Sequence, residues 1–197
     1  MSTDKGHGLL QARASSREAA NFDPPVPASL TPLIGRESEL AEIADLLAAT
    51  RLLTLTGVGG AGKTRLALQT ARCTSEQEEE VFVIELAAVD SPERLAPAVH
   101  QAVLAASANR SLQPAGRSAL DATMRRLADR DALLVLDNCE HLSEATARIV
   151  IALLGGCPRL RVLASSRQPL GVDGETALRF SVEFGLPSVR SCAFREA

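Results

Sequence analysis

The glycine-rich segment of the chain reads Gly57-Val58-Gly59-Gly60-Ala61-Gly62-Lys63-Thr64. It fits the spacing G-x-x-x-x-G-K-[ST] and lies between a short apolar run at residues 52–56 and a helical pattern at residues 63–73. Glycines let a backbone approach a phosphate closely, so that several N–H groups can surround it. A glycine-rich turn without this role is the alternative, and the flanking strand and helix argue against it. The segment therefore predicts a phosphate-binding loop, or P-loop.

The last residues of this segment supply the chemistry that a nucleotide needs. The Lys63 ammonium can reach the β and γ phosphates, and the Thr64 hydroxyl can bind Mg²⁺. Arg65 follows in the first helical turn and belongs to the same predicted binding segment. The whole of Gly57–Thr64 together with Arg65 is thus expected to hold the phosphates.

Apolar patterns with the periods of strands and helices alternate along the chain. This alternation predicts an α/β protein, in which a mostly parallel sheet of about five strands is flanked by helices in a three-layer P-loop NTPase fold. The predicted strands lie at residues 52–56, 81–86, 132–136, 161–165 and 177–182. The predicted helices lie at residues 38–49, 63–73 and 141–154, with one from Ser91 that Pro97 kinks or restarts and one through Leu120, Met124 and Leu127. Residues 1–29 are expected to be a flexible leader, residues 30–182 the nucleotide-binding domain and residues 183–197 an irregular tail.

The composition of the chain argues against several classes of function. The 197 residues are 46% hydrophobic and 23% charged, which is typical of one globular domain. A net charge of −3 leaves no basic excess, so this chain is not expected to bind DNA directly. We expect a cytoplasmic protein without a membrane partner, because no apolar run approaches the roughly 18 residues of a membrane span and no signal peptide is visible. The four cysteines form no Cys-x-x-Cys pair and are expected to be reduced.

An acidic residue ends the third predicted strand. Asp137 follows a continuous apolar run, and ligands of such sheets bind at the carboxyl ends of the strands. With the P-loop in the same chain, Asp137 suits the Walker B position that supports Mg²⁺, whereas a helix-capping Asp is the alternative. Asn138 stands where many ATPases have a second acid. Glu140 is the nearest substitute for positioning water, and the sequence equally allows it to be a first-turn helix acid.

A hydroxyl and a guanidinium follow the fourth predicted strand. Arg167 is placed to sense or stabilise the γ-phosphate, and a solvated loop arginine is the alternative. Cys139 and His141 have the spacing of a metal pair, but further ligands are missing from the pattern, so a helix start is the favoured interpretation. The predicted catalytic residues are therefore Lys63, Asp137, Glu140 and Arg167, and the predicted Mg²⁺ ligands are Thr64 and Asp137.

Four separated segments resemble one family of proteins. They are Leu33–Glu37 (LIGRE), the P-loop, Leu133–Leu142 (LLVLDNCEHL) and Val162–Gly171 (VLASSRQPLG). In this order they are similar to the nucleotide-binding domain of STAND ATPases of the NB-ARC and AAA-like kind, which occur in bacterial LuxR-type and related transcriptional regulators. The resemblance covers residues 30–180.

The resemblance implies a molecular switch that binds ADP in a resting form and ATP in an active one. Ile34 and Arg36 would lie near the adenine, and Ser165 would stand at the sensor position, where relatives usually have threonine. The implied cofactors are ATP or ADP with Mg²⁺, and the implied partner is a full-length regulator or a second copy of the chain. The lid domain and helix-turn-helix of such relatives are not found in this sequence, which predicts a truncated product with slow or partner-dependent hydrolysis. A non-catalytic interaction module and a small-molecule kinase are the two alternatives.

Overall fold

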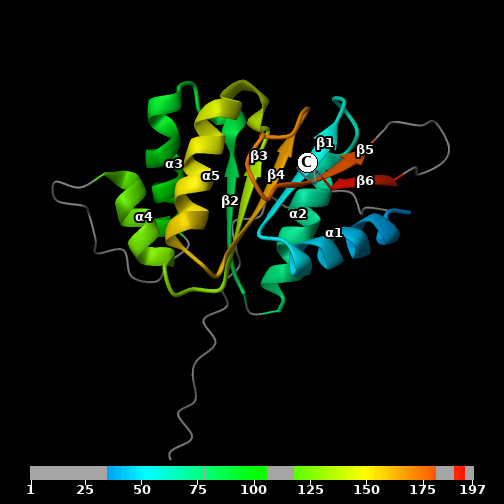
Figure 1. Ribbon diagram of the computed structural model, residues 1–197, viewed down its shortest axis with the longest axis horizontal. Helices are drawn as coiled ribbons and strands as arrows, with labels where there is room; N and C mark the ends of the chain where they lie inside the picture. Colours follow the sequence, from blue (N-terminus) through cyan, green and yellow to red (C-terminus); the bar gives the residue numbers. More distant parts are fainter. Residues whose placement is uncertain (1–34, 78, 106–117, 181–188, 194–197) are drawn as a thin grey trace, which may run out of the picture.

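The computed structural model describes residues 35–77, 79–105 and 118–180, together with the backbone of residues 189–193. Its centre is a six-stranded sheet with the strand order β2-β3-β4-β1-β5-β6 (Figure 1). The first five strands in this order are parallel, and β6 is antiparallel to β5 at one edge. The strands are β1 Leu52–Gly57, β2 Glu80–Glu85, β3 Ala132–Asp137, β4 Leu160–Ser166, β5 Thr176–Phe180 and β6 Val189–Ala193.

Helices cover both faces of the sheet. The α-helices are α1 Glu37–Ala49, α2 Lys63–Ser75, α3 Pro92–Ala105, α4 Ala119–Leu127 and α5 Ser143–Gly156, and two short 3₁₀ helices are η1 Leu86–Ala88 and η2 Cys139–Leu142. Figure 1 shows α1 and α2 on one side and α3, α4 and α5 on the other. None of the helices within the described ranges is both long and apolar enough to cross a bilayer. The predicted three-layer α/β fold is confirmed.

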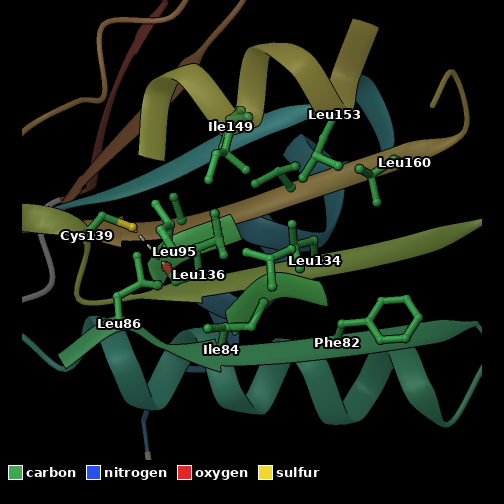
Figure 2. Packing of buried hydrophobic residues seen from close by; sticks show 14 of the residues in the cluster. Phe82, Ile84, Leu86, Leu95, Leu134, Leu136, Cys139, Ile149, Leu153 and Leu160 are labelled. Atoms are coloured by element: carbon green, nitrogen blue, oxygen red, sulfur yellow. Dashed lines mark hydrogen bonds between the residues drawn. The ribbon is translucent and has the colours of Figure 1, made fainter. Parts of the chain in front are cut away.

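The strands have a buried side chain on each face, because successive side chains alternate. Leu133 and Val135 of β3 belong to the core under α1 and α2, whereas Leu134 and Leu136 belong to the core under α3, α4 and α5. Figure 2 shows the latter core, with Ile149 and Leu153 of α5 above the strands. This division between faces fixes which strand-end residues can meet the start of α2.

Three expectations need correction. First, of the two effects expected of Pro97, a restart of the helix is not seen, because Pro97 lies inside one continuous helix, α3. Second, the helix expected at residues 141–154 is divided into η2 and α5, because Leu142 has non-helical dihedral angles, with a φ of −125° and a ψ of 25°. Third, part of the expected irregular tail forms β6, whose backbone pairs with the edge strand β5 although its sequence VRSCA has no apolar run. The expected leader lies outside the described residues.

Candidate nucleotide-binding site

The P-loop connects the carboxyl end of β1 to the first residue of α2. It begins at Gly57, where φ is 144° and a Cβ atom would lie 2.1 Å from the Phe180 carbonyl oxygen of β5. It ends at Gly62, which has a φ of 82° and is the N-cap of α2 without a side-chain hydrogen bond. Both positions therefore favour glycine. The first N–H groups of α2 keep the positive end of the helix dipole open to an anion.

The Lys63 side chain is folded over the loop. Its ammonium donates hydrogen bonds to the carbonyl oxygens of Gly57 at 2.9 Å and Val58 at 3.0 Å. An ammonium has three N–H donors, so these two bonds leave one for a further acceptor. The positive charge of Lys63 thus lies at the loop, where a phosphate would need it.

Hydroxyl groups of two elements meet on one carboxylate oxygen. Asp137 is the last residue of β3 and is 5% exposed. Its Oδ1 accepts hydrogen bonds from the Thr64 hydroxyl at 2.9 Å and from the Ser165 hydroxyl of β4. Ser165 Oγ in turn accepts a bond from the Asn138 backbone N–H at 3.0 Å. This network joins the start of α2 to the ends of β3 and β4.

The donor set fits Mg²⁺. Because the Thr64 hydroxyl gives its hydrogen to Asp137, its oxygen lone pairs remain available to a cation. The hydroxyl groups of Thr64 and Ser165 both bind Asp137 Oδ1 and not Oδ2, and within the described part of the chain no cluster of three or more acidic, His or Cys residues could hold a metal. One hydroxyl and one carboxylate are the sparse protein ligands that Mg²⁺ uses when phosphates and water complete its shell.

Glu140 and Arg167 form a separate pair. Arg167 Nε donates to Glu140 Oε1 at 3.1 Å, and the arginine side chain is 68% exposed. Glu140 lies in η2, whose Cys139 and Leu142 belong to the core under α3, α4 and α5. The carboxylate of Glu140 is thus held by a guanidinium, and its segment leaves the face of the sheet that carries α2.

Arg36 reaches the P-loop from the residue before α1. Its Nη1 donates to the Ala61 carbonyl oxygen at 2.9 Å and lies 3.4 Å from the Glu39 carboxylate. Glu39 is 3% exposed, and among the described residues its Oε2 has no hydrogen-bond partner. The described end of the LIGRE segment therefore contacts the P-loop directly. Ile34 lies outside the described residues.

The predicted site residues thus fall into two groups. The structure gathers the P-loop from Gly57 to Thr64 with Arg36, Asp137 and Ser165 at the carboxyl edge of the sheet. The central loop residues Gly59 and Gly60 have open space around them, and Val58 is exposed. Arg65 is an exposed residue of the first turn of α2. Glu140 and Arg167 bind each other at the loops that follow β3 and β4.

A carboxylate that the sequence patterns do not indicate organises the loop after β4. Glu175 accepts hydrogen bonds from the backbone N–H groups of Leu170 at 2.8 Å, Gly171 at 2.8 Å and Val172 at 3.3 Å. This loop begins at Arg167, so Glu175 restrains the segment that presents the guanidinium. The only sequence signal is an acid next to a glycine in a turn, which by itself does not reveal the bonds.

Cys139 and His141 do not form a metal pair. The Cys139 thiol is fully buried and donates to the Leu136 carbonyl oxygen, and burial followed by the charge of Asp137 raises its pKa to about 12. His141 Nε2 donates to the Val89 carbonyl oxygen at 3.0 Å, so its ring links the loops after β2 and β3. The favoured expectation of a helix start agrees with η2.

A glycine-rich loop between β1 and α2, with an acidic residue ending β3, defines the P-loop NTPase fold. The family described as "AAA ATPase domain" matches residues 32–164. The match covers well over half of the sequence, and the chain therefore belongs to the AAA ATPase domain family.

Individual relatives and structures agree with this assignment. A protein of Mycobacterium tuberculosis, provisionally named an HTH-type transcriptional regulator, is 45% identical over 138 residues, which are 68% of this chain and 14% of the relative. An uncharacterized protein of the same species is 39% identical over 151 residues, or 76% of this chain and 37% of that protein. The chain thus spans a minor part of these relatives.

Two solved structures share the fold. The Cdc6p protein of Pyrobaculum aerophilum has a TM-score of 0.56 at 19% identity, over 81% of this chain and 48% of that one. A STAND protein with a tetratricopeptide repeat sensor from Pyrococcus horikoshii has a TM-score of 0.55 at 15% identity, over 78% and 24%.

Proposed function

We propose that this chain binds ATP and ADP with Mg²⁺ as the nucleotide switch of a STAND-type transcriptional regulator, and hydrolyses ATP slowly or when a partner is bound. The observation that carries the proposal is the network in which Thr64 and Ser165 bind Asp137 beside the P-loop. The mycobacterial relative's name supports the regulatory context. In this proposal the present chain acts in the cytoplasm, and its partner is a full-length regulator or a second copy of the chain. Among the AAA-like ATPases it would belong to the NB-ARC and LuxR-type group.

Each residue of the site has a role in this proposal. The backbone N–H groups of the P-loop and the Lys63 ammonium hold the phosphates, and Thr64 and Asp137 hold Mg²⁺, which neutralises charge on the phosphates when bound. Ser165 fixes the Asp137 carboxylate so that its other oxygen faces the cation. Arg167 reads the γ-phosphate after leaving Glu140, which makes the Glu140–Arg167 ion pair a feature of the state without that contact. Once released, Glu140 is a candidate for positioning water.

Arg36 would report occupancy of the site to α1. Its guanidinium bonds to the Ala61 carbonyl and faces the buried Glu39, so a movement of the P-loop would be transmitted to the start of that helix. Ile34 and Arg36 together would border the adenine in this proposal, as the resemblance implies.

Thermal unfolding followed by circular dichroism tests nucleotide binding. The protein is measured alone, with Mg²⁺-ADP and with Mg²⁺-ATP, as wild type, as Lys63→Ala and as the control Arg148→Ala, which removes an exposed charge of α5. A ligand at about 100 times its Kd adds roughly 2.7 kcal/mol, or roughly 5–11 °C for a chain of this size. We expect this rise in wild type and Arg148→Ala and its loss in Lys63→Ala.

The melting curves, together with an assay of phosphate transfer and phosphate release, separate the alternatives. A cooperative melt that neither nucleotide changes would refute the proposal and favour a non-catalytic interaction module. Nucleotide binding followed by phosphate transfer to a metabolite, without release of free phosphate, would favour a small-molecule kinase.

A further inference from the structure

A second carboxylate lies beside Asp137 at the edge of the sheet. Glu85 is the last residue of β2, and the parallel pairing of β2 with β3 places it directly opposite Asp137. Neighbouring strands are about 4.8 Å apart, so the two residues are adjacent. The sequence patterns gave no reason to single out Glu85, because only the register of two distant segments brings it to this position.

Glu85 and Asp137 project from the same face of the sheet. Side chains alternate along a strand, and Val81 and Val83 of β2 belong to the core under α2 with Leu133 and Val135 of β3. Two residues further along each strand, Glu85 and Asp137 continue this face. They therefore lie on the side that carries the P-loop helix.

Glu85 is also available for chemistry. Its side chain is exposed, and in the described ranges of the chain it makes no hydrogen bond or ion pair. Glu140 is less exposed, at 26% for its side chain, and its carboxylate has bonding partners. Its carboxylate binds Arg167, an amide rotation brings the Asn138 nitrogen within 3.1 Å of it, and η2 enters the opposite core.

We infer that Glu85 is the carboxylate that accepts the proton of the attacking water during ATP hydrolysis, an inference that rests on the proposed function. The water oxygen forms a bond to the γ-phosphorus as the bond from that phosphorus to the β–γ bridging oxygen breaks. ADP leaves with the electron pair of the broken bond, and the proton of the water passes to the Glu85 carboxylate and then to solvent. Glu85 is a catalytic residue in this scheme and takes the role for which Glu140 is the other candidate. Glu140 then serves only as the partner of Arg167 in the state without the γ-phosphate contact.

General-base catalysis of hydrolysis would need a free carboxylate at this location. Asn138 offers an amide, which cannot accept a proton from water at neutral pH. The Asp137 carboxylate is engaged by two hydroxyl groups. A positioned general base contributes typically 10²–10⁴-fold to a rate. Removing the charge of Glu85 should therefore lower hydrolysis by about that factor.

The test compares Glu85→Gln with Glu140→Gln, Lys63→Ala and the control Glu76→Gln, which removes an exposed carboxylate at the opposite end of α2. Free phosphate release and the Mg²⁺-ATP shift of the melting temperature are measured for each. We expect Glu85→Gln to keep the wild-type melting shift while its phosphate release falls at least about 100-fold or to the level of Lys63→Ala. Sodium formate should restore part of the rate to Glu85→Ala, which opens space for a small carboxylate.

Each contrary result has a definite meaning. Equal rates for Glu85→Gln and Glu76→Gln overturn the inference, as does a loss confined to Glu140→Gln. Loss of the Mg²⁺-ATP shift in Glu85→Gln also overturns it, because the residue would then bind metal or nucleotide. If wild type melts higher with nucleotide but releases no more phosphate than Lys63→Ala, the hydrolysis part of the proposed function fails and the inference with it. If no nucleotide changes the melt, the whole proposed function fails.

Discussion

Gly57→Ala should destabilise the protein strongly through a clash between two neighbouring strands. The added Cβ would lie 2.1 Å from the Phe180 carbonyl oxygen and 3.1 Å from its carbon. Real Cβ atoms essentially never approach closer than 3.0 Å, so β1 and β5 must separate by about 1 Å where Gly57 pairs with Phe180. The new Cβ would be fixed to the Gly57 backbone, and the atoms that it meets belong to the Phe180 backbone, so no flexible side chain can move away.

The magnitude has two parts. Backbone strain of alanine at a φ of 144° costs about 1–3 kcal/mol, and overpacking costs about 1–3 kcal/mol more. The sum of about 2–6 kcal/mol is a large share of the roughly 5–15 kcal/mol that stabilises a domain. It corresponds to a fall of roughly 4–24 °C in melting temperature.

Gly59→Ala is the matched control. It lies in the same loop, its added methyl group would have no neighbouring atom within 4 Å, and its φ is not positive. Its unfolding free energy should change by less than about 1 kcal/mol. Urea unfolding followed by circular dichroism suits this comparison, because the chain has no Trp or Tyr for fluorescence. Equal urea midpoints for the two variants would refute the close approach of β5 to the start of the P-loop.

Other contacts give further predictions. Arg51→Ala removes three hydrogen bonds to backbone carbonyls at the end of α5 and the start of β4, so urea unfolding should show a loss of about 1–3 kcal/mol, and an unchanged midpoint would contradict this role. At pH 8 the exposed Cys73 should react with iodoacetamide while Cys139, with its pKa of about 12, stays unlabelled until urea unfolds the chain; mass spectrometry of the peptides would expose an error in either assignment. Burial, and secondly the charge of Arg126, lower the pKa of His100, so the unfolded chain binds more protons below about pH 6.5. Wild-type stability should therefore fall as the pH drops below about 6.5, measured by urea midpoints, and equal losses in wild type and His100→Gln would exclude this histidine as the cause.

Local patterns predicted the elements that bury apolar residues. The continuous run before Asp137 and the glycine cluster before Lys63 are strong signals, because a doubly buried strand and a glycine-rich turn each restrict the residues that they accept. The structure confirms the three-layer fold that they predict, in which one sheet lies between two layers of helices. The strand β6 was not predicted, because its sequence has no apolar alternation. An edge strand can form through backbone pairing with its neighbour alone, which here is β5.

The contacts of the site were predictable only in part. Thr64 and Asp137 could be paired from the sequence, because a P-loop and a strand-end acid meet at the carboxyl edge of a parallel sheet. The partners of Glu140 and Glu175 could not. The first depends on a left-handed turn at Asn138 and the second on a loop whose N–H groups converge on one carboxylate.

The direction of the chain after Asp137 explains why the proposed hydrolytic site would draw on β2. Side chains alternate along a strand, so a residue that continued β3 beyond Asp137 would face the opposite core, and the turn at Asn138 indeed carries η2 there. A group that shares the P-loop face with Asp137 must then come from a strand beside β3. On one side β4 supplies Ser165, whose hydroxyl binds the aspartate, and on the other side β2 supplies Glu85. In the proposed hydrolytic site, the Ser165 hydroxyl would orient the Asp137 carboxylate from one flank, and the exposed Glu85 carboxylate would accept the proton of the attacking water from the other.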